Sequence, residues 1–227
     1  MSSKIKLVSR ALCFLLGVFS AQTILAQSLQ AQSLQDRADK IRSTVDNGNL
    51  QIAVDELLSF KHADAPAFAL NNYDYLLARL SEALGDRAAS SSGYQALVAR
   101  RSLLTQYGLW HLAQLARSSG DLVQERERLR QLIFSGSTSL LRDAATMRLA
   151  ESFFESTDYT GAAETLRPLT ESKKTTVARH ALARMAEAYL GGGKRAEARE
   201  LFTRLVTQMP DASPVAVRTN DAVGSPQ

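Results

Sequence analysis

The sequence predicts an all-α protein, built as a solenoid of about five antiparallel helical hairpins. The first observation is a turn signal that recurs along most of the chain, at Asn47–Asn49, Gly85–Asp86, Gly120–Asp121, Thr157–Asp158 and Gly192–Lys194. Counted from Asn49 through each turn residue to Lys194, the spacings are 37, 35, 37 and 36 residues. A period of this length is typical of stacked supersecondary units, which bury their apolar faces against their neighbours.

The second observation is the apolar period between the turns. Apolar residues recur there at three- and four-residue steps, as in Leu76, Leu77, Leu80 and Leu84. This is the period of an amphipathic helix, and the chain has no run of alternating β-branched residues that would indicate a strand. Each segment between two turns is therefore expected to be helical.

The third observation is a register that repeats relative to the turn. An alanine stands eight residues before the last turn residue and follows a large apolar residue, giving Ala78, Ala113, Ala150 and Ala186. Apolar residues stand eight and eleven residues after it, giving Tyr94, Leu129, Leu166 and Phe202, then Leu97, Leu132, Leu169 and Leu205. Helical patterning in an ordinary bundle is the alternative, but a register fixed across four units favours a repeat.

The predicted elements follow in chain order. A first hairpin at about Asp36 to Lys61 keeps Ala53 and Leu57 but lacks the small first-helix residue, so we interpret it as a degenerate cap. Four hairpins in the common register come next. The resulting division is a signal peptide at 1–26, a linker at 27–35, the repeat domain at 36–210 and a flexible tail at 211–227.

The last unit carries a recognisable pattern, with its residues at Ala186, Tyr189, Gly193, Ala198, Phe202 and Pro210. This pattern resembles the tetratricopeptide repeat (TPR) family, and the third unit is similar through Ala150, Phe153, Ala162 and Leu166. The other two units depart from it, because Ser90 and Glu125 stand where the family has an alanine early in the second helix. The resemblance implies a TPR-like right-handed solenoid whose first helices line a groove for peptides or partner proteins.

A second resemblance concerns the amino-acid sequence and the order of the units. The stretches Tyr107–Ala116, Gly120–Leu122 and Glu125–Arg130 are similar to the helical N-terminal region of bacterial soluble lytic transglycosylases. In that family a lysozyme-like domain that cleaves peptidoglycan follows the solenoid, and no such segment is recognisable before Gln227. The resemblance therefore leaves an alternative open, in which the chain is the solenoid module of a truncated or split transglycosylase.

Residues 1–26 have the pattern of a secretory signal. A basic leader that ends at Arg10 precedes the apolar run Ala11–Phe19, and cleavage is expected after Ala26, so that Gln27 becomes the first mature residue. An uncleaved anchor is the weaker alternative, because the run is shorter than the roughly 20 residues that span a bilayer. The sequence thus predicts a periplasmic or secreted protein with no stable membrane insertion after cleavage.

Cleavage also changes the charge and the cysteine content. The single cysteine, Cys13, lies within the leader, too early to be a lipoprotein cysteine. The whole chain has 27 basic and 23 acidic residues, and the leader removes three basic residues and no acidic one, so the net charge falls from +4 to +1. The basic residues alternate with acidic ones along the predicted helices, which argues against a nucleic-acid partner.

Motifs for catalysis or metal binding are weak. Glu151 precedes a serine, as the catalytic acid of the transglycosylases does, but the rest of their motif does not follow. His62, His111 and His180 lie far apart in the sequence, which argues against a metal site. The stretch Gly191–Lys194 follows a helix instead of a strand, which argues against a phosphate-binding loop. We interpret the charged run Glu125–Arg130 as a solvated helix face. The sequence therefore predicts a protein that is not an enzyme, with no cofactor and no metal site.

The remaining hypothesis is a binding surface. Carrying the groove-facing positions of the TPR family onto this chain selects Tyr75, Arg79, Tyr107, Trp110, Gln114 and Arg117 as partner-binding residues, with Asn72, Met147, Glu151, Phe154, His180 and Glu187 as further groove positions. Aromatic and arginine side chains are the usual anchors of protein interfaces. The alternative for Trp110 is a packing role between repeats. The expected partner is a protein or peptide of the cell envelope or of peptidoglycan assembly, with peptidoglycan contact left open.

Overall fold

The structure, a computed structural model, describes residues 34–135 and 140–208. The predicted signal peptide, Cys13, nearly all of the linker and the tail at 211–227 lie outside the described residues. The described residues form helices and no strand, which confirms the all-α prediction. None of these helices is both long and apolar enough to cross a bilayer. The chain forms two compact units, Met1–Phe68 and Ala69–Gln227, which are treated separately below.

The first unit contains the predicted N-terminal hairpin. Residues 34–46 are helical, and α2 (Leu50–Ala63) follows a turn at Gly48, whose φ is 76°. The buried side chains between the helices are Ile41, Ala53, Val54, Leu57 and Phe60. A short helix, α3 (Ala65–Leu70), starts in this unit and was not anticipated from the sequence. Its Phe68 ring meets Phe60 edge to face at 5.7 Å, which closes the end of the hairpin.

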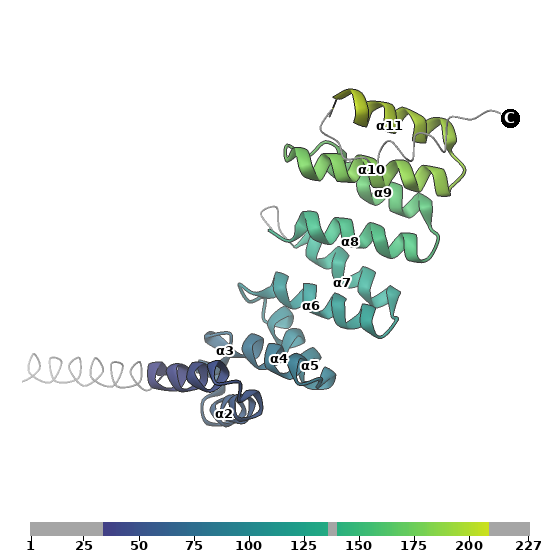
Figure 1. Cartoon of the computed structure of the whole chain (residues 1–227). Helices are drawn as coiled ribbons and strands as arrows, with labels where there is room; N and C mark the ends of the chain where they lie inside the picture. The colour runs from purple at the N-terminus through teal and green to yellow at the C-terminus, as the bar shows by residue number, and fades with distance from the viewer. Residues whose placement is uncertain (1–33, 136–139, 209–227) are drawn as a thin grey trace, which may run out of the picture. The chain divides into compact units, whose positions relative to one another are not determined.

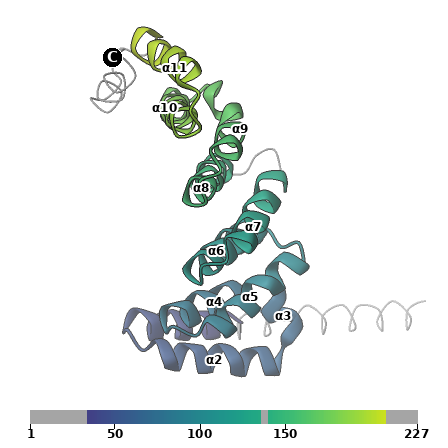
Figure 2. The ribbon, with the colours of Figure 1, turned by 90° about the vertical axis from the view of Figure 1, so that its right-hand side faces the viewer.

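The second unit consists of four hairpins in the predicted positions. They are α4 (Tyr73–Ala83) with α5 (Arg87–Ala99), α6 (Thr105–Ser118) with α7 (Leu122–Phe134), α8 (Arg142–Glu155) with α9 (Tyr159–Thr170), and α10 (Thr175–Gly191) with α11 (Arg195–Gln208). Each of these helices packs against the next one along the chain. The first helices α6, α8 and α10 lie along one side of the unit, and α7 and α9 lie on the other side (Figures 1 and 2).

The turns within the hairpins share one geometry. Gly85, Gly120 and Gly193 have φ values of 82°, 77° and 77°, and Thr157 takes the same left-handed conformation at 58°. In the second hairpin the N–H of Asp121 donates to the carbonyl of Ala116 at 2.9 Å, which closes the end of α6. The Asp121 carboxylate then accepts from the N–H of Gln124 at 2.9 Å and caps α7. Asp86 and Asp158 cap α5 and α9 in the same way.

The core follows the predicted register. The four alanines of the first helices and the eight apolar residues at the two second-helix positions are all buried. Small residues set the distance between the helices of a hairpin. A Cβ added at Gly93 of α5 would lie 2.8 Å from the Cβ of Ala78 on α4, so these helices already pack at their closest approach.

The two departures from the family pattern are buried as well. Ser90 and Glu125 occupy the same position in their hairpins as Ala162 and Ala198, and Glu125 is only 1% exposed. The prediction that the run Glu125–Arg130 is a solvated helix face was therefore wrong at Glu125. The position is fixed by the repeat register, and its equivalents Ala162 and Ala198 are buried in clusters that contain Ala150 and Ala186 of their own first helices.

Candidate functional site

We call one side of α4, α6, α8 and α10 the first-helix face. It carries the exposed and half-buried side chains of Tyr75, Arg79, Tyr107, Trp110, Gln114, Arg117, Glu151, Phe154 and Arg184. All six predicted partner-binding residues lie on two of these helices, with Tyr75 and Arg79 on α4 and the other four on α6. The exposed members are Arg79, Tyr107, Gln114 and Arg117, and the half-buried members are Tyr75 and Trp110. The six residues therefore lie on two neighbouring first helices.

Aromatic rings connect α4 to α6 on this face. The ring of Tyr75 lies 6.2 Å from that of Tyr107 and 5.9 Å from that of His111, measured between centroids. His111 in turn stacks on Tyr94 of α5 at 4.8 Å with an interplanar angle of 9°. Tyr107 is the exposed end of this aromatic cluster, at 38% exposure. The sequence analysis assigned His111 no binding role, because a histidine without a helix-spaced partner carries no local signal.

Hydrogen bonds to Glu82 and Arg79 of α4 hold the aromatic cluster in place. Tyr94 Oη donates to Glu82 Oε2 at 2.5 Å, and Arg79 Nη1 donates to the same oxygen at 3.1 Å. Arg79 Nη1 also lies 3.3 Å from His111 Nδ1. His111 Nδ1 lies equally close to Glu82 Oε2, at 3.3 Å, so this nitrogen faces both the guanidinium and the carboxylate. On the other side of the ring, His111 Nε2 lies 3.4 Å from Tyr75 Oη.

The environment keeps this cluster uncharged apart from the Arg79–Glu82 pair. Burial lowers the pKa of His111 and Arg79 lowers it further, while Glu82 opposes them. Burial, with the hydrogen bond to Glu82, raises the pKa of Tyr94 well above its ordinary value. Burial also raises the pKa of Tyr75. A neutral and largely buried imidazole therefore lies between two phenols, beside the Arg79–Glu82 ion pair.

A chain of ion pairs continues the face from α6 to α8. Arg117 Nη2 lies 3.2 Å from Glu155 Oε1, and Arg148 donates to both oxygens of Glu155 at 2.9 and 3.0 Å. Arg148 also donates to both oxygens of the buried Glu125, at 2.5 and 3.1 Å. Burial alone would lower the pKa of Arg148, but the two carboxylates raise it overall. The hydrogen bond from Arg148 correspondingly lowers the pKa of Glu155 against the effect of burial.

Arg184 of α10 makes the corresponding link from α8 to α10. It donates to the two oxygens of Glu151 at 2.7 and 2.5 Å, pairs with Glu187, and lies 4.2 Å from the centre of the Phe154 ring. Glu151 is therefore held as a partner of Arg184. Chemistry by a general acid would instead need a protonated carboxyl beside a substrate. Neighbouring first helices are thus joined by Arg79–His111, Arg117–Glu155 and Glu151–Arg184.

Two predicted positions have a packing role as well. Trp110 is half-buried and packs against the core formed by residues that include Leu109, Ala113 and Leu149. Asn72 precedes α4 in a left-handed conformation, and its side chain accepts hydrogen bonds from Ser102 and Arg100. The packing interpretation of Trp110 therefore holds for part of its surface, and Asn72 ties the α5–α6 connection to α4.

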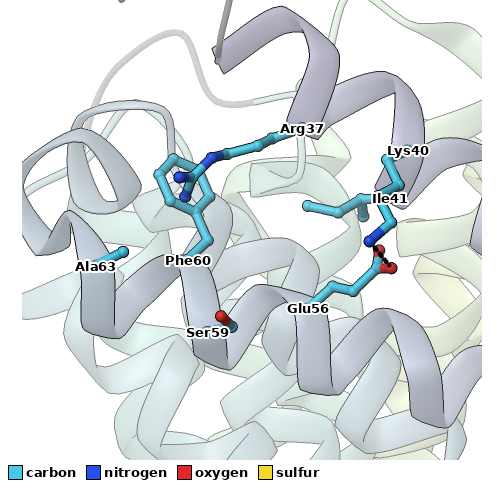
Figure 3. A pocket seen from close by; sticks show the side chains of 7 residues that line it. All are labelled: Arg37, Lys40, Ile41, Glu56, Ser59, Phe60 and Ala63. Atoms are coloured by element: carbon cyan, nitrogen blue, oxygen red, sulfur yellow. Dashed lines mark ion pairs between the residues drawn. The ribbon is translucent and has the colours of Figure 1, made fainter.

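The first unit has a pocket of its own, of about 230 Å³, between the helix at 34–46 and α2. Figure 3 shows the Arg37 guanidinium over the Phe60 ring, at 5.1 Å, and Lys40 reaching Glu56, at 2.9 Å. The charged groups at this pocket are thus mostly engaged with its own walls. In the described part of the chain, no group of three or more His, Cys, Asp or Glu residues is placed to hold a metal ion.

Comparisons with known proteins agree with this architecture. The model of the tetratricopeptide repeat family matches residues 180–212, which is the unit whose pattern was clearest in the sequence. A tetratricopeptide repeat protein from Parabacteroides merdae is similar in structure, with a TM-score of 0.60 and 19% identity over 85% of this chain and 72% of that one. No curated protein matches the chain in sequence.

Two further solved structures are similar at the level of the fold. MamA has a TM-score of 0.57 with 15% identity, over 77% of this chain and 90% of its own. YrrB, described as a TPR protein with an unusual peptide-binding site, has a TM-score of 0.56 with 11% identity, over 82% of this chain and 90% of its own. These likenesses show a TPR-like solenoid.

Proposed function

We propose that this chain of tetratricopeptide-repeat fold is an exported scaffold, which holds a protein or peptide of the cell envelope on its first-helix face. The observation that carries the proposal is the aromatic cluster of Tyr75, Tyr107 and His111, fixed by hydrogen bonds at the surface of α4 and α6. Aromatic side chains bury a large area at a small entropic cost, and a preorganised cluster loses little freedom when a partner binds.

The charges on the face define what kind of segment fits. Arg79 is compensated by Glu82, Arg117 by Glu155, and Arg184 by Glu151 and Glu187. A face with paired charges offers little net attraction to a strongly charged ligand. We therefore propose a partner segment with apolar or aromatic side chains for the cluster at Tyr107, and with polar groups for the exposed amide of Gln114.

A peptide is the partner class best supported by the likenesses. The description of YrrB names a peptide-binding site in a protein of the same fold, and we extend that class of partner to this chain as a proposal. The place in the envelope rests on the predicted signal peptide and on the resemblance to the transglycosylase solenoid. Peptidoglycan assembly is the process we propose, with the chain serving as a binding module and not as the enzyme.

Export is tested by the mass of the mature protein. The full-length chain is expressed in its native host, the periplasmic fraction is isolated, and the intact mass is measured. We expect a chain that begins at Gln27. A chain that retains residues 1–26 and stays in the cytosolic fraction would overturn the envelope assignment and leave the binding face untouched.

The binding face is tested by crosslinking in the cell. A photoreactive benzoylphenylalanine is placed at Tyr107 and, as the matched control, at Val123 of α7, which is 74% exposed on a second helix. We expect a discrete adduct from position 107 and none from position 123, because only the first-helix face holds the partner. Equal adducts from both positions, or an adduct from position 123 alone, would count against the proposal.

The absence of catalysis is tested separately. Purified mature protein is incubated with peptidoglycan, and soluble muropeptides are measured against a buffer blank. We expect no release, because Glu151 is engaged by Arg184. Release that Glu151→Gln abolishes would support the alternative of a transglycosylase module.

A further inference from the structure

A second groove lies on the other side of the same unit, away from the first-helix face. Its volume is about 370 Å³, and residues of α5, α6 and α7 line it. The floor is apolar, with Leu112, Leu115 and Ala116 from α6. Polar side chains form the walls and the rim: Arg87, Ser91 and Gln95 from one side, and Ser119, Asp121, Gln124 and Arg128 from the other.

The next repeat shows how the equivalent space is filled. Arg126 stands five residues after the turn aspartate Asp121, and Ser91 stands five residues after Asp86. Arg126 lies across its groove, with Nε donating to Ser152 Oγ at 3.0 Å and Nη2 donating to Ser156 Oγ at 2.6 Å. Its guanidinium also stacks over the Phe153 ring at 4.4 Å.

Small residues leave the groove of the α5–α7 repeat open. Counted from the turn aspartates, Ser91 replaces Arg126 and Ala116 replaces Phe153. The long side chain that would span the groove and the ring that would support it are both missing from this repeat. The same floor position is Tyr189 in the last hairpin. The opening is thus a property of this repeat and does not follow from the repeat fold.

The charge at the open groove is positive. Arg87 and Arg128 replace Leu122 and Thr165 of the next repeat, again counted from the turn aspartates. Within the described residues, the Arg87 guanidinium has no ion-pair partner, and Arg128 donates only to the neutral Gln131, at 3.2 Å. Asp121 is the one acidic residue among the lining residues, and one of its oxygens is engaged as the cap of α7.

We infer that this groove binds an acidic, partly apolar segment of a partner protein, at a site separate from the first-helix face. The apolar floor removes apolar side chains of the segment from water, and the two uncompensated guanidinium groups pair with its carboxylates. Gln95, whose Nε2 donates to Ser91 Oγ at 3.2 Å, and Gln124 also line the groove and supply amide groups for the backbone of the segment.

Peptide selection tests the inference without knowledge of the partner. A display library of random 12-residue peptides is selected on the full mature chain and counter-selected on the Ser91→Arg variant, which restores the side chain that fills the next groove. We expect the recovered pool to be net acidic. A pool with no net acidity, or no enrichment that Ser91→Arg removes, would overturn the inference.

Affinity of the best recovered peptide then localises the contact. We expect the dissociation constant to rise about tenfold with Ser91→Arg, about fivefold with Arg87→Gln/Arg128→Gln, and not at all with Tyr107→Ala. Ser92→Arg adds the same charge at an exposed neighbouring position and is the matched control. An equal loss with Ser92→Arg would refute the site. If Ser91→Arg loses its helical circular dichroism, the pair Arg87→Gln/Arg128→Gln decides the outcome, since both guanidinium groups are peripheral.

Discussion

Arg148 of α8 donates two hydrogen bonds to Glu125 of α7, with Nε 2.5 Å from Oε1 and Nη2 3.1 Å from Oε2. The carboxylate is 1% exposed and stands where the other hairpins carry Ala162, Ala198 or Ser90. The pair joins the second hairpin of the unit to the third, and Glu155 and Arg117 extend it to the surface. A position that elsewhere supports packing alone here supports an ionic link between repeats.

Removing one partner of this link leaves a buried charge poorly compensated. We expect Glu125→Ala to lower the free energy of unfolding by about 2 to 3 kcal/mol. The loss is smaller than for a fully buried pair, because Arg148 still has Glu155 as an ion-pair partner. Urea denaturation followed by circular dichroism measures the loss. The matched control is Glu127→Ala on the exposed side of the same helix, which should change stability by less than about 0.5 kcal/mol. Equal effects of the two variants would contradict the link.

His111 makes the stability depend on pH. Its pKa lies below the ordinary value of 6.5 in the folded protein, because it is buried beside Arg79. The unfolded chain therefore binds more protons, so stability is full above about pH 6.5 and falls as the pH drops through the lowered pKa. Protonation would place a positive charge in a largely buried ring 3.3 Å from Arg79 Nη1, and Glu82, at the same distance from Nδ1, offsets only part of this cost.

The measurement compares urea midpoints at about pH 7.5 and pH 5.5. We expect His111→Phe, which keeps a ring on Tyr94, to flatten the difference that the unchanged protein shows. His180→Gln at an exposed position of α10 serves as the control and should leave the difference intact. An unchanged pH dependence in His111→Phe would show that another group is responsible.

Thr157 is a strained turn residue. It adopts a φ of 58° where the other hairpins of the unit have glycine, and a β-branched residue is disfavoured in this region. We expect Thr157→Gly to raise the free energy of unfolding by about 1 kcal/mol, as relief of strain outweighs the added chain entropy. The reciprocal change, Gly120→Ala, should lower it by a similar amount. A loss of stability in Thr157→Gly would mean that its hydroxyl contact with the Ser156 carbonyl matters more than the strain.

Trp110 contributes to packing as well as to the surface. Its contact with the core around Leu109 predicts that Trp110→Ala lowers stability by about 2 kcal/mol while the helical spectrum is retained at 25 °C. Gln114→Ala, one turn further along the exposed side of α6, is the matched control and should be nearly neutral. If both variants unfold at the same urea concentration, Trp110 has no packing role.

The repeat could be predicted because its signals are local in the sequence. The turn residues and the alanines such as Ala113 recur at fixed spacing, and each of them determines the geometry of its own hairpin. The burial of all four alanines confirms that register. The six residues of the candidate site came from the resemblance to the TPR family, whose groove-facing positions fall on adjacent first helices once the register is known.

The pairings between hairpins could not be predicted in the same way. Glu125 lies in a run of charges at helical spacing, and such a run normally faces the solvent. Only the repeat register, in which Glu125 is equivalent to Ala162, indicates that Glu125 is buried. No local sequence pattern predicts that Arg148 is its partner. His111 likewise gained its role from Tyr75 and Arg79 on another helix. The groove at Ser91 depends on side chains that are small relative to those of the next repeat, which a motif does not reveal.

The most direct test of the central claim is the affinity of the partner segment for the first-helix face. The segment mapped by the crosslink at Tyr107 is synthesised and titrated against the unchanged protein, Tyr107→Ala and Val123→Ala by isothermal calorimetry. We expect Tyr107→Ala to weaken binding at least about tenfold, or roughly 1.4 kcal/mol, with unchanged circular dichroism, and Val123→Ala to bind normally. Equal affinities of the three proteins would contradict the account.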